Sequence, residues 1–239
     1  MDLMRVQRFG SPDGGQLVLQ GFSSSLGRPS YGAMVRLNTG IDCALTVKPK
    51  MTLAEFESAW LPDHVTVRSV TNFDLAGRRV AVADLAFASQ WGTRQVRWAA
   101  WEGVTGIVQS AWDAVSAEEA LHRIDLIGPS DGANGPVVSA PFLHTKRGLR
   151  CLFPPVADGW LVIERRWPDQ TDMPSPVAPG KAVPGGQMFQ STGASRSPSL
   201  TLLSDSNCAT FVQAAGITQA AATAVRQTTV SWSSPRAGG

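Results

Sequence analysis

The chain has 239 residues, of which 43% are hydrophobic and 17% charged, so it can bury at least one sizeable core. Its formal net charge of +2 is far from the clustered positive charge that general nucleic-acid binding requires. The three cysteines form no CxxC pair, which argues against a disulfide framework and against a zinc site.

The hydropathy pattern bears on the location of the protein. The first residues lack the apolar segment of a signal peptide, and no stretch of the chain is apolar enough to form a membrane-spanning helix. The odd number of cysteines favours a reducing compartment. We therefore expect no signal peptide, no membrane insertion, and a location in the cytoplasm or within a soluble assembly.

Alternating apolar residues predict three short strands at the start of the chain. In the third of them, Cys43, Leu45 and Val47 occupy alternate positions, as one face of a sheet demands. The three predicted strands span residues 16–22, 32–37 and 42–47.

Two capping boxes predict two helices. Thr52 with Glu55 opens a helix over 53–61, whose Leu53 and Phe56 lie on one face. The second capping box is formed by Ser116 and Glu119, and it predicts a helix that Gly128 and Pro129 end.

Four strands joined by short turns are predicted between these helices, and they form an antiparallel meander. In the second strand, Val80 and Val82 are out of phase with Leu85 and Phe87, so a bulge or a change of register is expected near Ala83 and Asp84. The four predicted strands span residues 65–70, 79–88, 94–101 and 104–112.

A family resemblance rests on four stretches within these elements. They are Thr52-Leu53-Ala54-Glu55-Phe56, Phe73-Asp74-Leu75-Ala76-Gly77-Arg78-Arg79, Thr93-Arg94-Gln95-Val96-Arg97 and Trp101-Glu102-Gly103. Together with the order of elements over 14–128, they make the chain similar to the PsbP-like and DcrB-like superfamily. The chain departs from that pattern because it lacks an export signal and continues for more than a hundred residues beyond the second helix.

The resemblance implies an α+β fold, in which an antiparallel sheet and two packed helices form an α/β/α sandwich. The superfamily includes photosystem subunits, a small-GTPase cofactor, surface lipoproteins and chaperones of secreted toxins. What these proteins share is binding to a partner, without a common catalytic apparatus. No functional residue carries over to this chain.

The predicted organisation has four parts. They are a PsbP/DcrB-like α+β domain over 1–130, a β-rich extension over 131–167, a Pro/Gly/Ser-rich linker or arm over 168–200, and a C-terminal docking segment over 201–239. Strands are expected at 137–143, 149–153 and 160–166 in the extension, and a helix at 217–226 followed by a strand at 228–232 in the last part. No internal repeat is evident.

Catalytic motifs receive little support. Gly128-Pro129-Ser130-Asp131-Gly132 matches G-x-S-x-G and His144 follows, but a serine hydrolase needs a strand-to-helix turn around the serine, and here a helix leads into a loop. His122 and Asp125 have helical spacing, but two ligands do not make a metal site. We expect no catalytic residue, cofactor or metal.

Large apolar side chains outside the expected core supply the candidate partner-binding residues. Tryptophans near turns and apolar residues in the expected arm and docking segment are typical anchors of protein contacts. The predicted set is Trp91, Trp101, Met188, Phe189, Phe211 and Trp232.

The sequence therefore predicts a non-enzymatic protein-binding or structural assembly component of a larger complex, such as a virion, a secretion machine or a bioenergetic assembly. Its partners would be other protein subunits. One alternative is a carrier or chaperone that binds an apolar ligand or a hydrophobic segment. A serine hydrolase-like enzyme is the third hypothesis.

Overall fold

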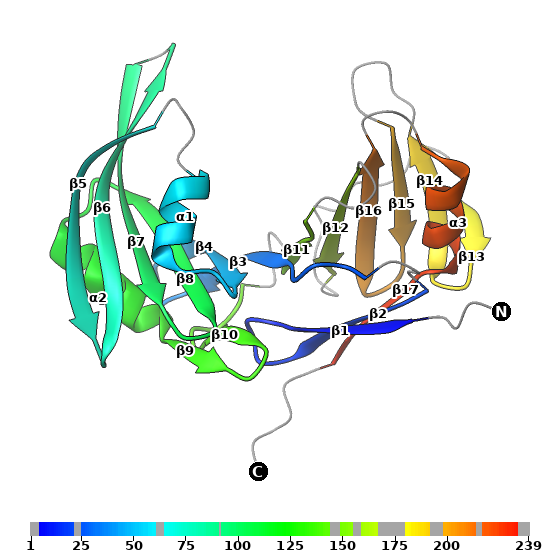
Figure 1. Cartoon of the computed structure of the whole chain (residues 1–239), viewed down its shortest axis with the longest axis horizontal. Helices are drawn as coiled ribbons and strands as arrows, with labels where there is room; N and C mark the ends of the chain where they lie inside the picture. The colour runs from blue at the N-terminus through cyan, green and yellow to red at the C-terminus, as the bar shows by residue number, and fades with distance from the viewer. Residues whose placement is uncertain are drawn as a thin grey trace. The chain divides into compact units, whose positions relative to one another are not determined.

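The computed structural model describes residues 5–21, 25–60, 65–90, 92–143, 149–154, 159–166, 180–191, 198–213 and 217–233. It divides into two compact units, shown with their elements in Figure 1. Unit 1 comprises Met1–Gly32 and Leu143–Gly239, and unit 2 comprises Ala33–Phe142. None of the helices in the described ranges is long and apolar enough to cross a membrane.

Unit 2 contains a six-stranded antiparallel sheet in the order β3-β4-β8-β7-β6-β5. Strand β3 begins in unit 1 and continues into unit 2. The elements are β3 (Ser30–Arg36), β4 (Asp42–Pro49), α1 (Leu53–Trp60), β5 (Val65–Leu75), β6 (Arg78–Ser89), β7 (Gly92–Glu102), β8 (Gly106–Asp113), α2 (Ala117–Ile127), β9 (Pro129–Gly132) and β10 (Gly135–Val138).

The two helices of unit 2 cover opposite faces of its sheet (Figure 1). On one face, Leu53 and Phe56 of α1 pack in a cluster with Ala83, Trp98 and other residues of β6 to β8. On the other face, α2 contacts β6, β7 and β8, and the guanidinium of Arg123 lies over the Trp112 ring. Central strands with both faces covered are apolar at successive positions.

A carboxylate ties the β9–β10 hairpin to the rest of unit 2. Asp131 Oδ1 accepts hydrogen bonds from the backbone N–H and the hydroxyl of Thr105, each at 2.8 Å. Asp131 Oδ2 lies 2.9 Å from Nη2 of Arg78. Burial raises the pKa of Asp131, but the hydrogen bonds from Thr105 and Val104 and the charge of Arg78 outweigh it, so the pKa is lowered.

This lowered pKa predicts a pH dependence of stability. A carboxyl group whose pKa falls on folding stabilises the fold above its unfolded pKa of about 3.9, and this stabilisation is lost as the pH falls through the folded pKa. We expect the thermal midpoint of the wild type to fall more steeply below about pH 4 than that of Asp131→Asn. Thermal unfolding between pH 7 and 2.5 measures this, and equal slopes for the two proteins would contradict it.

In unit 1, six strands pair antiparallel in the order β11-β12-β16-β15-β14-β13, and residues 30–32 of β3 pair with β11, so the twelve strands form one continuous ladder. A separate three-stranded sheet has the order β1-β2-β17. The elements are β1 (Val6–Gly10), β2 (Gln16–Gln20), β11 (Arg150–Leu152), β12 (Gly159–Arg165), β13 (Lys181–Val183), β14 (Gly186–Ser191), β15 (Ser199–Leu203), β16 (Asn207–Gln213), α3 (Gln219–Gln227) and β17 (Thr229–Ser233).

The sheets of the two units have the same topology. In each unit, the first two strands in chain order pair with each other, and the sixth strand pairs with the second. The fifth, fourth and third strands follow outward in that order, and a helix comes after the sixth strand. Thus β11 to β16 and α3 of unit 1 repeat the order of β3 to β8 and α2 of unit 2. The chain contains a structural repeat that its sequence does not display.

The predicted fold class is wrong. Strands account for 60% of the structure and helices for 13%, so the chain is mostly β and is not an α+β sandwich with two packed helices. The reason lies in the second half of the chain, where β9 to β16 form between residues 129 and 213.

The structure also divides the chain differently from the four predicted parts. The boundary falls at residues 33 and 142, so unit 1 combines both ends of the chain. Within the predicted arm of 168–200, β13 and β14 are hydrogen-bonded to each other, and β14 pairs with β15. The described part of that segment therefore belongs to a sheet, because main-chain pairing satisfies its polar groups.

Candidate functional site

One face of the unit 1 sheet exposes apolar side chains. Cross-strand pairing places Leu152 opposite Val162, and Trp160 opposite Val212, so these four residues lie on the same face. The Leu152 and Trp160 side chains are 45% and 43% exposed. Phe189, opposite Thr201, extends the same face on β14. We call this surface, centred on Leu152, Trp160, Val162, Val212 and Phe189, the unit 1 face.

The opposite side of the same strands forms the core of unit 1. Leu161 and Phe211 are paired with each other, and Phe211 is also paired with Leu200, and all three are buried. Because side chains alternate along a strand, the buried set fixes the orientation of the exposed set. The unit 1 face is thus held rigidly by hydrogen-bonded strands.

The unit 1 face carries few charges. Among the described residues of its strands, the charged side chains on this side are Arg150 and Glu164, which pair at 3.3 Å on neighbouring strands. Toward β15, the hydroxyls of Thr201 and Thr210 lie 3.4 Å apart. The surface is therefore neutral, and it combines apolar and hydroxyl groups around a tryptophan, which is typical of protein contact sites.

In unit 2, a helix packs on the side of the sheet that corresponds to the unit 1 face. In unit 1 the α3 N-terminus is held on the core side, because the Thr218 N–H donates to the buried Gln213 side chain at 3.0 Å. The turn before β16 repeats the turn before β8, because the Ser204 N–H donates to the Asn207 carbonyl as the Gly103 N–H donates to the Gly106 carbonyl. Gln213 on the α3 side therefore corresponds to Trp112 on the α2 side. It follows that the unit 1 face is equivalent to the side that α1 covers in unit 2. There the Phe56 ring stacks on Trp98 with a centroid distance of 5.4 Å.

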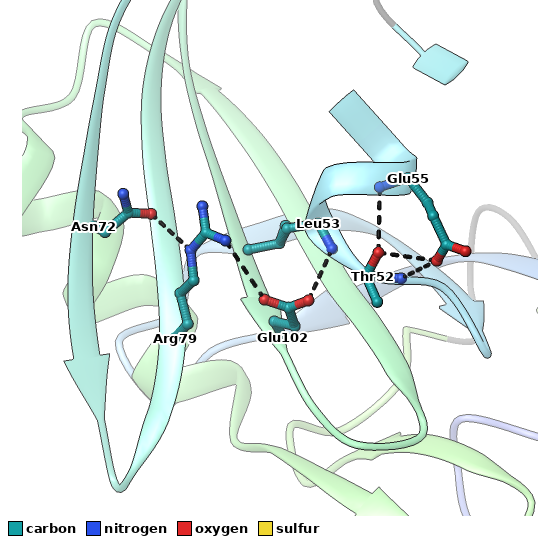
Figure 2. Close-up of polar contacts among 6 residues, drawn as sticks. All are labelled: Thr52, Leu53, Glu55, Asn72, Arg79 and Glu102. Atoms are coloured by element: carbon teal, nitrogen blue, oxygen red, sulfur yellow. Dashed lines mark hydrogen bonds and ion pairs between the residues drawn. The ribbon is translucent and has the colours of Figure 1, made fainter. Parts of the chain in front are cut away.

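Polar contacts fix α1 to its face, as Figure 2 shows. Glu102 on β7 accepts a hydrogen bond from the Leu53 N–H at 3.0 Å, and it lies 3.8 Å from Nη1 of Arg79. Arg79 Nε donates in turn to Asn72 on β5 at 2.9 Å. The carboxylate satisfies a backbone donor at the start of α1, so these contacts are structural.

The predicted partner-binding residues are only partly exposed. Trp101, Met188 and Phe211 are buried, so their side chains serve the cores and not a surface. Trp91 lies outside the described residues. Phe189 is half-buried and belongs to the unit 1 face.

Trp232 is half-buried and is engaged within unit 1. Its indole N–H donates to Asn207 Oδ1, and the Arg165 guanidinium lies 5.7 Å from the ring centroid. These contacts join β17 to the main sheet of unit 1, so the residue contributes to packing inside this unit.

The sequence reasoning missed Leu152 and Trp160. Both lie in segments that were expected to be strands, but Trp160, Leu161, Val162 and Ile163 are all apolar. A strand with apolar residues on both sides does not reveal which side faces solvent. The exposed pair could be identified only once the cross-strand register was known.

The residues considered for catalysis are not brought together by the described structure. Ser130 is exposed on β9, which pairs with β10 in a hairpin, and His144 lies outside the described residues. His122 and Asp125 are both exposed on α2. No group of three or more His, Cys, Asp or Glu in the described ranges could hold a metal ion.

The cysteines are buried thiols. Burial raises the pKa of Cys43, Cys151 and Cys208, and the rise is largest for Cys151. The Cys43 sulfur accepts a hydrogen bond from the Trp112 indole N–H at 3.3 Å. Thiols of raised pKa in apolar surroundings are poor nucleophiles.

Three comparisons with known proteins were made. A scan against protein-family models, a search of curated proteins and a search of solved structures each found no match.

Proposed function

We propose that this protein is a non-enzymatic protein-binding or structural assembly component of a larger complex. The observation that supports this is the unit 1 face, where Leu152 and Trp160 are 45% and 43% exposed on paired strands. A single exposed leucine is ordinary, but apolar side chains grouped around a tryptophan on a neutral surface are typical of an interface core.

The occupant of the unit 1 face is an amphipathic helix of a partner protein. In unit 2 the equivalent face is covered by α1, which inserts Leu53 and Phe56 against the strands. A helix with apolar residues three and four apart covers a sheet face in the same manner. The low charge of the unit 1 face suits such an apolar stripe, because a docked helix would not bury an unpaired charge.

The test uses a photo-crosslinking amino acid at position 160, introduced into the full chain in its native cells. We expect a crosslink to a helical segment of one partner protein. The matched control places the same amino acid at Val104, which is 75% exposed in unit 2, and it should not capture that partner. Crosslinking at 160 that only repeats the pattern at 104 would contradict the proposal.

Binding of the captured partner then measures the contribution of the face. Trp160→Glu is expected to raise Kd at least about 30-fold, the effect of a hot-spot tryptophan worth about 2 kcal/mol. Val104→Glu should leave Kd unchanged. An unchanged Kd for Trp160→Glu, measured by titration calorimetry, would exclude the unit 1 face as the docking surface.

A further inference from the structure

Strand β5 is the free edge of the unit 2 sheet. It is the last strand in the sheet order, and all of its eleven residues except Arg68 pair with β6 on one side. Residues 66 to 72 are all exposed, and Val67 and Val70 are 37% and 45% exposed. An exposed edge presents unpaired N–H and C=O groups to another strand.

The turn after β5 determines which backbone groups face outward. Ala76 and Gly77 have φ values of 52° and 76°, and they join the paired residues Leu75 and Arg78. Positive φ at both central residues is the signature of a type I′ turn, whose flanking residues exchange hydrogen bonds. Since hydrogen bonding alternates along an antiparallel pair, Val70, Asn72 and Asp74 direct their N–H and C=O groups to the free edge.

Two charged side chains on this edge lack a partner of opposite sign in the described structure. Arg68 is the extra residue of a bulge: Val67 pairs with Leu85 and Ser69 with Asp84, and Arg68 between them has no partner on β6. Asp74 accepts a hydrogen bond from the Gly77 N–H but pairs with no cation among the described residues. Every other arginine of unit 2 lies within 4.0 Å of a carboxylate: Arg36, Arg78, Arg79, Arg94, Arg97 and Arg123.

We propose that β5 pairs with β5 of a second copy of this chain, antiparallel and with the twofold axis at Thr71. In this register, Val70 lies opposite Asn72 of the second copy, and both direct their backbone groups to the edge. Arg68 lies opposite Asp74 of the second copy. The twofold axis also places Asp74 of the first copy opposite Arg68 of the second, so two such pairs form. The sequence of β5 is therefore complementary to itself in charge, as an isologous interface requires.

The charges select this register over its neighbours. Moving the axis to Val70 places Arg68 opposite Asn72, and moving it to Asn72 places Arg68 opposite Ala76. Only the axis at Thr71 pairs the two charges. The bulge and the charges also restrict pairing with unrelated strands, which is how natural edge strands avoid indiscriminate association. The proposal goes beyond the function proposed above and uses a different surface, so either can fail alone.

A charge-exchange experiment tests the pairing. Sedimentation velocity of the full chain between about 5 and 200 µM is expected to show a monomer–dimer equilibrium, since edge pairing is a small interface. Arg68→Asp and Asp74→Arg should each weaken dimerisation at least tenfold, and the double variant Arg68→Asp/Asp74→Arg should restore it. Arg94→Asp, on the same sheet but away from its edge, should dimerise as the wild type. A monomeric wild type, or a double variant no better than the singles, overturns the proposal.

Disulfide trapping tests the register independently. At the axis, Thr71 faces itself in a non-hydrogen-bonded pair, whose Cα separation of about 4.5 Å permits a disulfide. Thr71→Cys should therefore form a covalent dimer under mild oxidation, while the buried native cysteines do not. Thr66→Cys is the matched control, because the register separates the two copies of residue 66 by about 33 Å. Equal crosslinking of both variants, or none of Thr71→Cys, overturns this register.

Discussion

Replacing Trp98 with alanine is expected to destabilise unit 2 by about 3 to 5 kcal/mol, the usual cost of removing a buried tryptophan. Trp98 is 5% exposed, stacks on Phe56, and donates its indole N–H to Gln109 Oε1 at 2.8 Å. The truncation removes the ring on which α1 packs and leaves a buried amide without its donor. Urea unfolding, with hydrogen exchange of the β6 to β8 amides, measures the effect.

Trp98→Phe is the matched variant for this experiment. It keeps an aromatic ring against Phe56 but removes the hydrogen bond to Gln109, so the loss should be smaller than for alanine. The exposed Trp160→Ala, in unit 1, should leave the amides of β6 to β8 as protected as in the wild type. If Trp98→Ala and Trp160→Ala destabilise unit 2 equally, the cluster around Phe56 does not support its sheet.

The local elements of unit 2 could be predicted because their signals are local. The capping box at Thr52 and Glu55 is formed, with the Glu55 carboxylate accepting from the Thr52 N–H at 2.7 Å. The helix predicted over 53–61 spans Leu53–Trp60, and the predicted meander is β5 to β8. Caps and alternation depend on neighbouring residues, so they are visible without the fold.

The irregularity expected near Ala83 and Asp84 has a different origin. The register does shift beside Asp84, but the extra residue is Arg68 on β5. Val80, Val82 and Leu85 are all buried, because helices cover both faces of the sheet at β6. The change of phase in the sequence therefore reflects two buried faces as well as a bulge in the neighbouring strand.

Strands β13 and β14 of unit 1 were missed because composition was weighed above turns. The Pro, Gly and Ser content of 168–200 suggested an arm, yet Pro184 and Gly185 separate the paired residues Val183 and Gly186. That dipeptide is a hairpin turn signal, and Met188 beyond it is buried. The structural repeat could not be seen in the sequence, because two sheets can share a strand order and the alternation of side chains without sharing any residues.

Replacing Gly106 with alanine is expected to destabilise unit 2 strongly, because backbone atoms occupy the space of a side chain. Gly106 has a φ of +148°, and a Cβ atom there would come within 2.2 Å of the Lys48 carbonyl oxygen and 2.7 Å of Pro49 Cα. Neither contact can be relieved by a side-chain rotation, so β8 must move away from β4, to which it is paired. Thermal and urea unfolding of the variant measure the loss.

Gly40→Ala separates the contribution of the clash from that of the backbone conformation. Gly40 also has a positive φ, +81°, but a Cβ atom there would meet nothing within 4 Å. Its substitution should cost only the conformational strain, about 1 to 2 kcal/mol. We expect Gly106→Ala to cost at least about 2 kcal/mol more, since strain and clash add. Equal losses for the two variants would contradict this expectation. They would mean that β4 and β8 can move apart at Gly106 without losing their pairing, so that the close approach of these strands does not stabilise unit 2.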